Sequence, residues 1–310
     1  MKNLETMNNF TLKNIPNLNE VILAALELFE NGGVPKLNLG KYKKPLVIGS
    51  VNAFFTGKIL FVNSSAVFAN ESDYKNKIKT NPDIDGCILI SASGAKHAIP
   101  MAKFLKTKNI ETRLLTNNPD APAKKYIDDN KFFVFPKNRE PYTYNTSTYL
   151  GMILGKTKEN PKLIKEFILK RIKPILDKKK IKYDSYYLII PNEFDSIRDM
   201  FLTKFDELLQ PAVSGRCFTV DQSMHAKNVV VSDKELFISF GYANEDYGLK
   251  NNRLHIPLPD KADFGALMAI GYYVIGKIQN SQPPYFQQNI KNYMKRTSKI
   301  FGKEMKAIVE

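Results

Sequence analysis

The sequence has 310 residues, of which 43% are hydrophobic and 25% are charged, a balance that is ordinary for a folded globular protein. No stretch approaches the roughly 20 apolar residues of a membrane-spanning helix, and the N-terminal MKNLETMNNF lacks the apolar core of a signal peptide. We therefore expect a cytoplasmic protein with no membrane partner. The formal charge of +15 indicates an anionic partner, either a small phosphorylated molecule or a nucleic acid.

Cysteine content and the distribution of basic residues narrow these classes. Cys87 and Cys217 offer neither a disulfide framework nor metal-ligand spacing, so we expect both in or near the core, with no metal and no other cofactor. The basic run from Lys170 to Lys182 shows no spacing typical of a nucleic-acid-binding motif, and we expect it to be a solvated linker. Nucleic acid is therefore not the expected partner.

The first half of the chain alternates between strand and helix patterns. Apolar residues recur at helical spacing between Leu18 and Phe29, and Asn31-Gly32-Gly33 supplies a stop. The expected elements that follow are strand 45–48, helix 53–60, strand 87–90, a helix to about 106, strand 113–116, strand 132–135 and helix 147–155. This order predicts parallel strands, because parallel neighbours need a crossover between them.

The pattern starts again after the basic run. The expected elements are strand 186–190, helix 194–209, strand 235–240 and strand 253–258. We therefore predict an α/β protein with two doubly wound parallel-sheet halves of the flavodoxin or Rossmann kind. The predicted domains are residues 1–160 and 161–310.

One loop of the first half has the composition of an anion site. The apolar run that ends at Ile90 continues directly into ISASGAKHAIP, which places serines and a glycine between a strand and a helix. Small residues at such a position let backbone N–H groups approach an anion. The second half has no counterpart of this loop, so the first half is expected to hold the anion.

These residues resemble the motif of the sugar isomerase (SIS) domain superfamily, which is Ser-x-Ser-Gly-x-Thr followed by a strand that ends in Thr-Asn. The chain reads SASGAK at 91–96, with Lys96 in place of the threonine, and LLTN at 114–117, while NTST at 145–148 resembles the family's Ala-Ser-Thr helix start. The segment GSVN at 49–52 resembles the family's Gly-x-Ser segment. The resemblance implies a site for phosphate and sugar formed by Ser50, Asn52, Ser91, Ser93, Gly94, Lys96, Thr116, Ser147 and Thr148.

The second half resembles, more narrowly, the isomerase domain of glucosamine-6-phosphate synthases. KFDELL at 204–209 resembles a helix motif Lys-x-Lys-Glu, and DQSMH at 221–225 resembles Gly-Glu-x-x-His. The resemblance implies that Glu207 moves the proton between sugar carbons and that His225 assists ring opening from the neighbouring subunit. It therefore also implies a homodimer with a shared active site. Gln222 and Ala226 depart from the family pattern.

Three residues are secondary candidates for the same site. Glu140 is a loop carboxylate that is expected close to the sugar, and His97 lies beside the serine-rich loop. Lys295 ends an Asn-x-x-Lys stretch that resembles a sugar-contacting lysine in the synthase.

The combined prediction is a phosphosugar aldose/ketose isomerase of carbohydrate metabolism that transfers a proton through an enediol or enediolamine. The N-terminal Met-Lys-Asn offers no cysteine nucleophile, so we expect no glutaminase domain. Two alternatives stay open. One is a phosphosugar-binding regulator without catalysis, which the departures at Lys96, Gln222 and Ala226 favour. The other is a deglycase of amino-sugar phosphates.

Overall fold

The computed structural model describes residues 2–226 and 228–310, which pack as two compact units. Unit 1 comprises Met1–Gly33, Asn138–Ser147 and Glu159–Glu310, and unit 2 comprises Val34–Lys137 and Thr148–Lys158. These units are defined by packing and are discontinuous in sequence. The predicted division of the chain at residue 160 stays a prediction. The N-terminal helices belong with the C-terminal half.

Unit 2 is built on a five-stranded, wholly parallel sheet with the strand order β2-β1-β3-β4-β5. The strands are β1 Pro45–Ile48, β2 Val67–Ala69, β3 Gly86–Ile90, β4 Thr112–Thr116 and β5 Phe132–Val134. Every residue of β1 and β3 is buried, as expected of parallel strands that are covered on both faces. The four strands expected here, 45–48, 87–90, 113–116 and 132–135, are therefore confirmed to within one residue.

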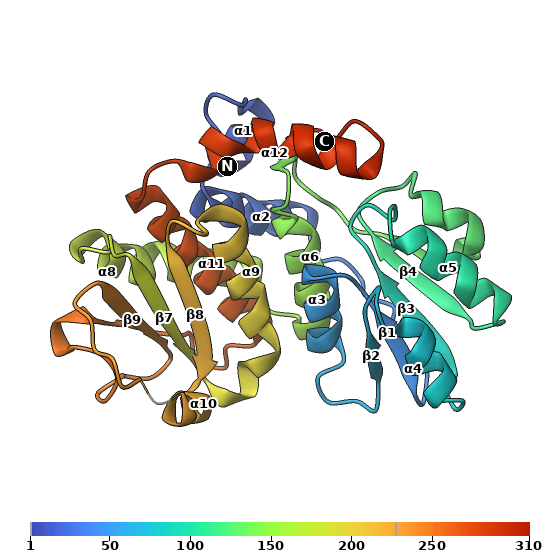
Figure 1. The fold of residues 1–310 in the computed structure, drawn as a ribbon, viewed down its shortest axis with the longest axis horizontal. Helices are drawn as coiled ribbons and strands as arrows, with labels where there is room; N and C mark the ends of the chain where they lie inside the picture. Colours follow the sequence, from blue (N-terminus) through green and yellow to red (C-terminus); the bar gives the residue numbers. More distant parts are fainter. Residues whose placement is uncertain (1, 227) are drawn as a thin grey trace. The chain divides into compact units, whose positions relative to one another are not determined.

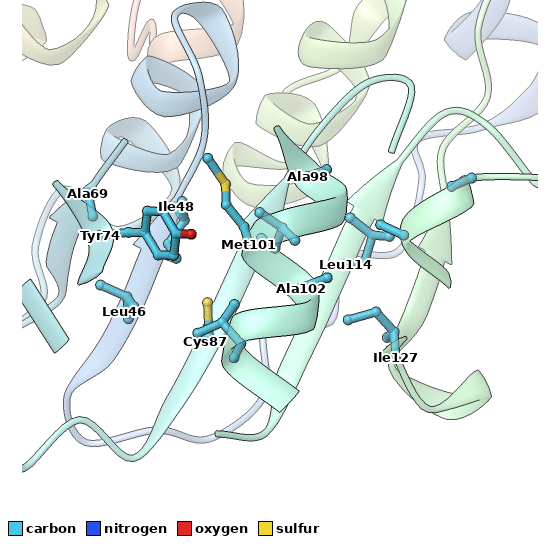
Figure 2. Close-up of a cluster of buried hydrophobic side chains, with 14 residues drawn as sticks. Leu46, Ile48, Ala69, Tyr74, Cys87, Ala98, Met101, Ala102, Leu114 and Ile127 are labelled. Atoms are coloured by element: carbon cyan, nitrogen blue, oxygen red, sulfur yellow. The ribbon is translucent and has the colours of Figure 1, made fainter. Parts of the chain in front are cut away.

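Helices cover both faces of this sheet (Figure 1). They are α3 Asn52–Leu60, α4 Tyr74–Thr80, α5 Ala98–Thr107, the 3-10 turns η1 Pro122–Tyr126 and η2 Asp129–Lys131, and most of α6 Thr146–Thr157. Figure 2 shows Met101 and Ala102 of α5 packed over Cys87 and Leu114, in a cluster that also contains Tyr74 of α4. Burial of such side chains contributes about 1.5–3 kcal/mol each and holds α4 and α5 on one face.

The strand order places a crevice-forming switch between β1 and β3. The chain leaves β1 toward β2 on one side, whereas β3 leads to β4 on the other side. In open parallel sheets, ligands bind outside the carboxyl ends of the strands at such a switch point. The loops that follow β1 and β3 are therefore where a ligand of unit 2 is expected.

Unit 1 contains a second parallel sheet, with the order β10-β9-β7-β8. Its strands are β7 Ser185–Ile190, β8 Ser214–Thr219, β9 Glu235–Phe240 and β10 Arg253–Ile256. A separate antiparallel pair joins β6 Glu140–Pro141 to β11 Ile308–Val309. The two parallel sheets confirm the predicted α/β class and its two doubly wound halves.

The helices of unit 1 lie against this sheet and against one another. They are α1 Lys2–Asn9, α2 Leu18–Gly32, α7 Pro161–Phe167, the π-helical turn η3 Ile168–Ile172, α8 Lys173–Lys178, the 3-10 turn η4 Asn192–Ile197, α9 Arg198–Leu208, α10 Val220–His225, the 3-10 turn η5 Lys250–Asn252, α11 Phe264–Ser281 and α12 Tyr285–Phe301. Phe205 of α9 packs on Tyr186 of β7, with ring centroids 5.9 Å apart. Helix α11 packs between α9 and α2, which ties the N-terminal segment to this unit.

The contact between α2 and α11 depends on a glycine and gives a first prediction. A Cβ added at Gly276 of α11 would lie 1.9 Å from the backbone nitrogen of Asn19 in α2. We expect Gly276→Ala to lower the free energy of unfolding by about 3 kcal/mol, because two backbones must separate. Urea unfolding measures the loss. Gly32→Ala is the matched control, since nothing lies within 4 Å of that added Cβ. An equal effect of the two substitutions would contradict the close approach.

Two expectations from the sequence are corrected or completed here. The basic run at 170–182 was expected to be a solvated linker, but it contains the end of η3 and all of α8. Ile172 and Leu176 are buried in the core and anchor this segment, whereas most of its lysines are exposed. Both cysteines are buried, as expected. Among the residues that the structure describes, no helix is both long and apolar enough to cross a membrane.

Candidate functional site

The loop between β3 and α5, residues 91–97, is shaped by Gly94. This glycine has a φ of +59°, and an added Cβ would lie 2.3 Å from the Cβ of Ala121. Its carbonyl accepts a hydrogen bond of 2.9 Å from the backbone N–H of Ala123. The loop can therefore press against the segment after β4 only because residue 94 has no side chain.

The end of β4 holds the loop from behind. The Thr116 hydroxyl is fully buried and donates to the carbonyl of Ala92 over 2.7 Å. The Asn118 side chain donates to the carbonyl of Ser93 over 3.0 Å. The backbone N–H of Asn117 also donates to the carbonyl of Ala92. Three hydrogen bonds from the end of β4 therefore hold the loop in place without a ligand. Thr116 is thus committed to the loop backbone in this structure.

The loop itself carries two of the hydroxyls that were predicted to bind phosphate, those of Ser91 and Ser93. Ser93 is exposed, and Ser91 is half-buried with its Oγ accepting a 3.2 Å bond from the N–H of Gly94. Lys96 follows at a φ of +49°, and the exposed His97 occupies the N-cap position of α5. The loop therefore presents small hydroxyls and a helix N-terminus together, an arrangement that favours an anion.

The neighbouring loop after β1 carries the other two predicted residues of this edge. Ser50 is half-buried, and Asn52 begins α3 with a buried Oδ1 that has no hydrogen-bond partner among the described residues. Val51 between them has φ 50° and ψ −117°, a conformation that a β-branched residue rarely adopts. Strained backbone of this kind persists where the surroundings impose it and is frequent at ligand sites.

Ser147 and Thr148 are buried at the start of α6. In unit 2, the Thr148 Oγ1 accepts a 2.5 Å hydrogen bond from the side chain of Asn117. In unit 1, the Ser147 Oγ accepts from the N–H of Asn138 over 2.9 Å. Both hydroxyls therefore already have a protein partner. Asn117, which was not among the predicted site residues, links Thr148 to the strand that holds the loop.

Glu140 serves as the acidic cap of α6. Its two carboxylate oxygens accept the backbone N–H groups of Thr146, at 2.6 Å, and of Ser147, at 2.8 Å. Burial raises the pKa of this carboxyl, and the hydrogen bonds from the helix start oppose that rise. Because both oxygens are held, Glu140 has less freedom to act as a base than the sequence suggested.

The charge of unit 2 matches an anionic ligand. This unit contains 19 lysines and arginines but eight aspartates and glutamates, so it carries a surplus of 11 from the chain's +15. A positive surplus concentrated on one unit raises the local concentration of anions and their association rate. The basic composition of the protein is thus largely a property of the unit that contains the serine-rich loop.

Glu207 in unit 1 forms an ion pair that its own helix creates. Lys204 lies three residues earlier on α9, so the two side chains share one face, and Nζ lies 2.6 Å from the Glu207 Oε2. Lys204 is completely buried, and its Nζ also donates to the carbonyls of Thr143, at 3.2 Å, and Tyr144, at 2.9 Å. Lys204 was not among the predicted site residues, and its i, i+3 spacing to Glu207 is the signal in the sequence that indicates the pair.

The Glu207 carboxyl is tuned by two opposing effects. Burial raises its pKa above the usual range, and the Lys204 ammonium lowers it in part. The net shift is upward, so the carboxylate has a higher proton affinity than a solvated glutamate. A base that removes a weakly acidic C–H proton near neutral pH benefits from that change.

His225 and Lys295 are exposed residues of unit 1. His225 is the exposed last residue of α10, and no hydrogen bond or ion pair of residues 2–226 and 228–310 joins it to Glu207. Lys295 is exposed on α12. Gln222 completes a capping box with Thr219 and donates to Asp195 over 2.9 Å. An amide suits this position because a glutamate would face the Asp195 carboxylate.

Comparison with known proteins identifies the fold. No family model matches the sequence, and no curated protein matches it. Among solved structures, the C-terminal domain of glucosamine-fructose-6-phosphate aminotransferase from Francisella tularensis aligns with a TM-score of 0.62 at 12% identity, over 88% of this chain and 98% of that one. Glucosamine-6-phosphate deaminase from Thermotoga maritima aligns at 0.58 and 15%, over 85% and 93%.

A third solved structure also aligns over most of this chain. Tagatose-6-phosphate ketose/aldose isomerase from Escherichia coli aligns with a TM-score of 0.56 at 13% identity, over 86% of this chain and 92% of that one. The chain therefore has the SIS-like fold that the sequence motifs predicted. At these identities the likeness shows the fold alone.

Proposed function

We propose that the protein binds a phosphosugar through the loop after β3 and isomerises it between aldose and ketose forms. The observation that carries the proposal is the serine-rich loop, which Thr116 and Asn118 hold at the carboxyl edge of the sheet beside a topological switch point. The positive surplus of unit 2 supports an anionic ligand. The sugar phosphates named for the structural neighbours support this ligand class.

The proposed chemistry is a proton transfer by Glu207. The carboxylate takes the proton from the carbon beside the carbonyl, the electron pair of that C–H bond forms the C=C bond of an enediolate, and the carbonyl π pair moves to its oxygen. The proton then returns to the neighbouring carbon, while the hydroxyl proton passes from the other sugar oxygen to the former carbonyl oxygen. The raised pKa of Glu207 supports the base role, and Lys204 keeps the carboxylate oriented. His225 is assigned to ring opening from a second copy of the chain, so a homodimer belongs to the proposal. The cytoplasmic location that the sequence predicts also belongs to it.

Calorimetric titration tests the binding part of the proposal. We expect glucose 6-phosphate, fructose 6-phosphate or glucosamine 6-phosphate to bind, and the corresponding unphosphorylated sugar to bind far more weakly. A chain that binds the sugars equally well with and without phosphate would contradict phosphate recognition. Binding without turnover would favour the phosphosugar-binding regulator, and release of ammonia from the amino sugar would favour the deglycase.

A single hydroxyl at the loop tip gives the second prediction. Ser93→Ala is expected to weaken binding of the phosphosugar by about 1–3 kcal/mol, the usual loss when a charged group forfeits a hydrogen bond. The dissociation constant from calorimetry should therefore rise about 5- to 150-fold. Ser64→Ala is the matched control, since Ser64 is exposed in the same unit but precedes β2 at the opposite edge of the sheet. Equal dissociation constants for parent and Ser93→Ala would remove Ser93 from the site.

A further inference from the structure

Thr143 has a backbone conformation that its side chain disfavours. Its φ is +78°, a left-handed value that glycine adopts readily and a β-branched residue rarely does. The residue lies between β6 and α6, in the segment Asn138–Ser147 of unit 1. A glycine or asparagine would relieve the strain, so the presence of threonine needs a reason that local stability does not supply.

The Thr143 hydroxyl also lacks a partner. Its Oγ1 is buried, and no residue that the structure describes donates to it or accepts from it. The same ten-residue segment contains two more buried polar atoms in this condition, Asn138 Nδ2 and Thr146 Oγ1. Buried polar atoms without partners are rare in folded proteins and indicate water or a ligand that completes them. Each of the three polar atoms therefore lacks the partner that water or a ligand would supply.

The position of Thr143 next to the ion pair of Lys204 and Glu207 indicates which ligand could complete its hydroxyl. The Lys204 Nζ lies 3.2 Å from the Thr143 carbonyl and 2.6 Å from the Glu207 Oε2. The Thr143 carbonyl and the Glu207 carboxylate are thus joined through one ammonium group. The Thr143 backbone therefore lies beside the ammonium group that holds the proposed base.

We infer that the Thr143 hydroxyl hydrogen-bonds a hydroxyl of the substrate next to the carbons that exchange the proton, and so contributes to sugar specificity. The inference rests on the proposed function, because it takes Glu207 as the base. A bound ligand would explain both the strained backbone of Thr143 and its hydroxyl without a hydrogen-bond partner.

Three substitutions at this position separate the hydroxyl from the strain. Thr143→Ser keeps the hydroxyl, Thr143→Ala removes it, and Thr143→Gly removes both the hydroxyl and the strain. With fructose 6-phosphate or glucosamine 6-phosphate, whichever the parent turns over, we expect Thr143→Ala and Thr143→Gly to lower kcat/KM about tenfold. Thr143→Ser should stay within about threefold of the parent, while Thr143→Gly should have a higher Tm than the parent.

The control lies on the same helix as the ion pair. Thr203→Ala removes a hydroxyl that already donates to the carbonyl of Asp199, at 2.7 Å, and should leave kcat/KM unchanged. Calorimetry with 2-deoxy-, 3-deoxy- and 4-deoxyglucose 6-phosphate identifies the sugar group that Thr143 contacts. With one of these sugars, parent and Thr143→Ala should bind equally well, because the group that Thr143 contacts is already absent.

The outcomes distinguish this inference from the function on which it rests. Loss of kcat/KM with Thr143→Ala, recovery with Thr143→Ser and a higher Tm with Thr143→Gly support it. An active parent with unchanged kcat/KM in Thr143→Ala overturns the role of Thr143 and leaves the proposed function standing. A parent that neither binds nor converts any of these sugar phosphates overturns both.

Discussion

Replacing Glu207 by glutamine is expected to abolish isomerisation while phosphosugar binding stays within about twofold of the parent. The amide keeps the shape of the side chain but cannot accept the proton, so kcat should fall by about 10³-fold or more. The measurement is turnover of the phosphosugar that the parent converts, together with its dissociation constant from calorimetry. Asp206→Asn is the control, because Asp206 is the exposed neighbouring carboxylate on α9.

Full turnover by Glu207→Gln would assign the base to another residue. Glu140 would then be next to test, although both of its oxygens already accept backbone N–H groups. In that case the likeness to known isomerases would stand only as a statement about fold. Loss of binding as well as turnover would instead show that the carboxylate holds the ligand.

Removal of the Lys204 charge is expected to have the largest effect on stability. Lys204→Met leaves the Glu207 carboxylate, whose side chain is only 19% exposed, without its ammonium partner. Breaking a largely buried pair in this way costs about 3–5 kcal/mol. Urea unfolding near neutral pH measures the loss of free energy. Glu207→Gln combined with Lys204→Met should recover part of it, because no uncompensated buried charge remains. If the double variant were no more stable than Lys204→Met alone, this account would be contradicted.

The pH dependence of that defect follows from the direction of the Glu207 pKa. Burial already raises this pKa in the folded parent, and loss of Lys204 removes the effect that lowers it. The folded protein then binds the proton more tightly than the unfolded chain, whose glutamate titrates near 4.5. The stability loss of Lys204→Met relative to the parent should therefore be largest at neutral pH and should diminish as the pH falls toward 4.5. A loss that is constant with pH would point to packing alone.

Local sequence signals were sufficient for most elements of unit 2, although β2 and α4 were not predicted. The apolar runs at Pro45–Ile48 and Gly86–Ile90 are short, bounded by glycine or small polar residues, and separated by helical patterns, which is enough to predict parallel strands. Strand β8 was not predicted, because SGRCFT contains a glycine and an arginine and lies at the edge of its sheet. Its backbone hydrogen bonds to β7 stabilise the strand, although its composition does not favour one.

The roles of individual site residues depended on contacts far apart in sequence. The serine-rich loop was recognisable from its composition, but the bond by which Thr116 supports the loop at Ala92 was not. The ligand contact of Thr116 stays a prediction. Likewise, Lys204 is held by carbonyls some 60 residues earlier in the chain. Folding brings these partners together, and no periodicity or motif in a single sequence records them.

The most direct test of the central claim is proton exchange at the sugar carbons, followed by NMR in D₂O. The protein would be incubated with glucose 6-phosphate, fructose 6-phosphate, mannose 6-phosphate and glucosamine 6-phosphate, with Glu207→Gln alongside. The account predicts deuterium at carbon 1 or carbon 2 of at least one of these sugars with the parent, and none with Glu207→Gln. Absence of deuterium from all four sugars with the parent, under conditions where calorimetry shows binding, would contradict isomerisation by this protein.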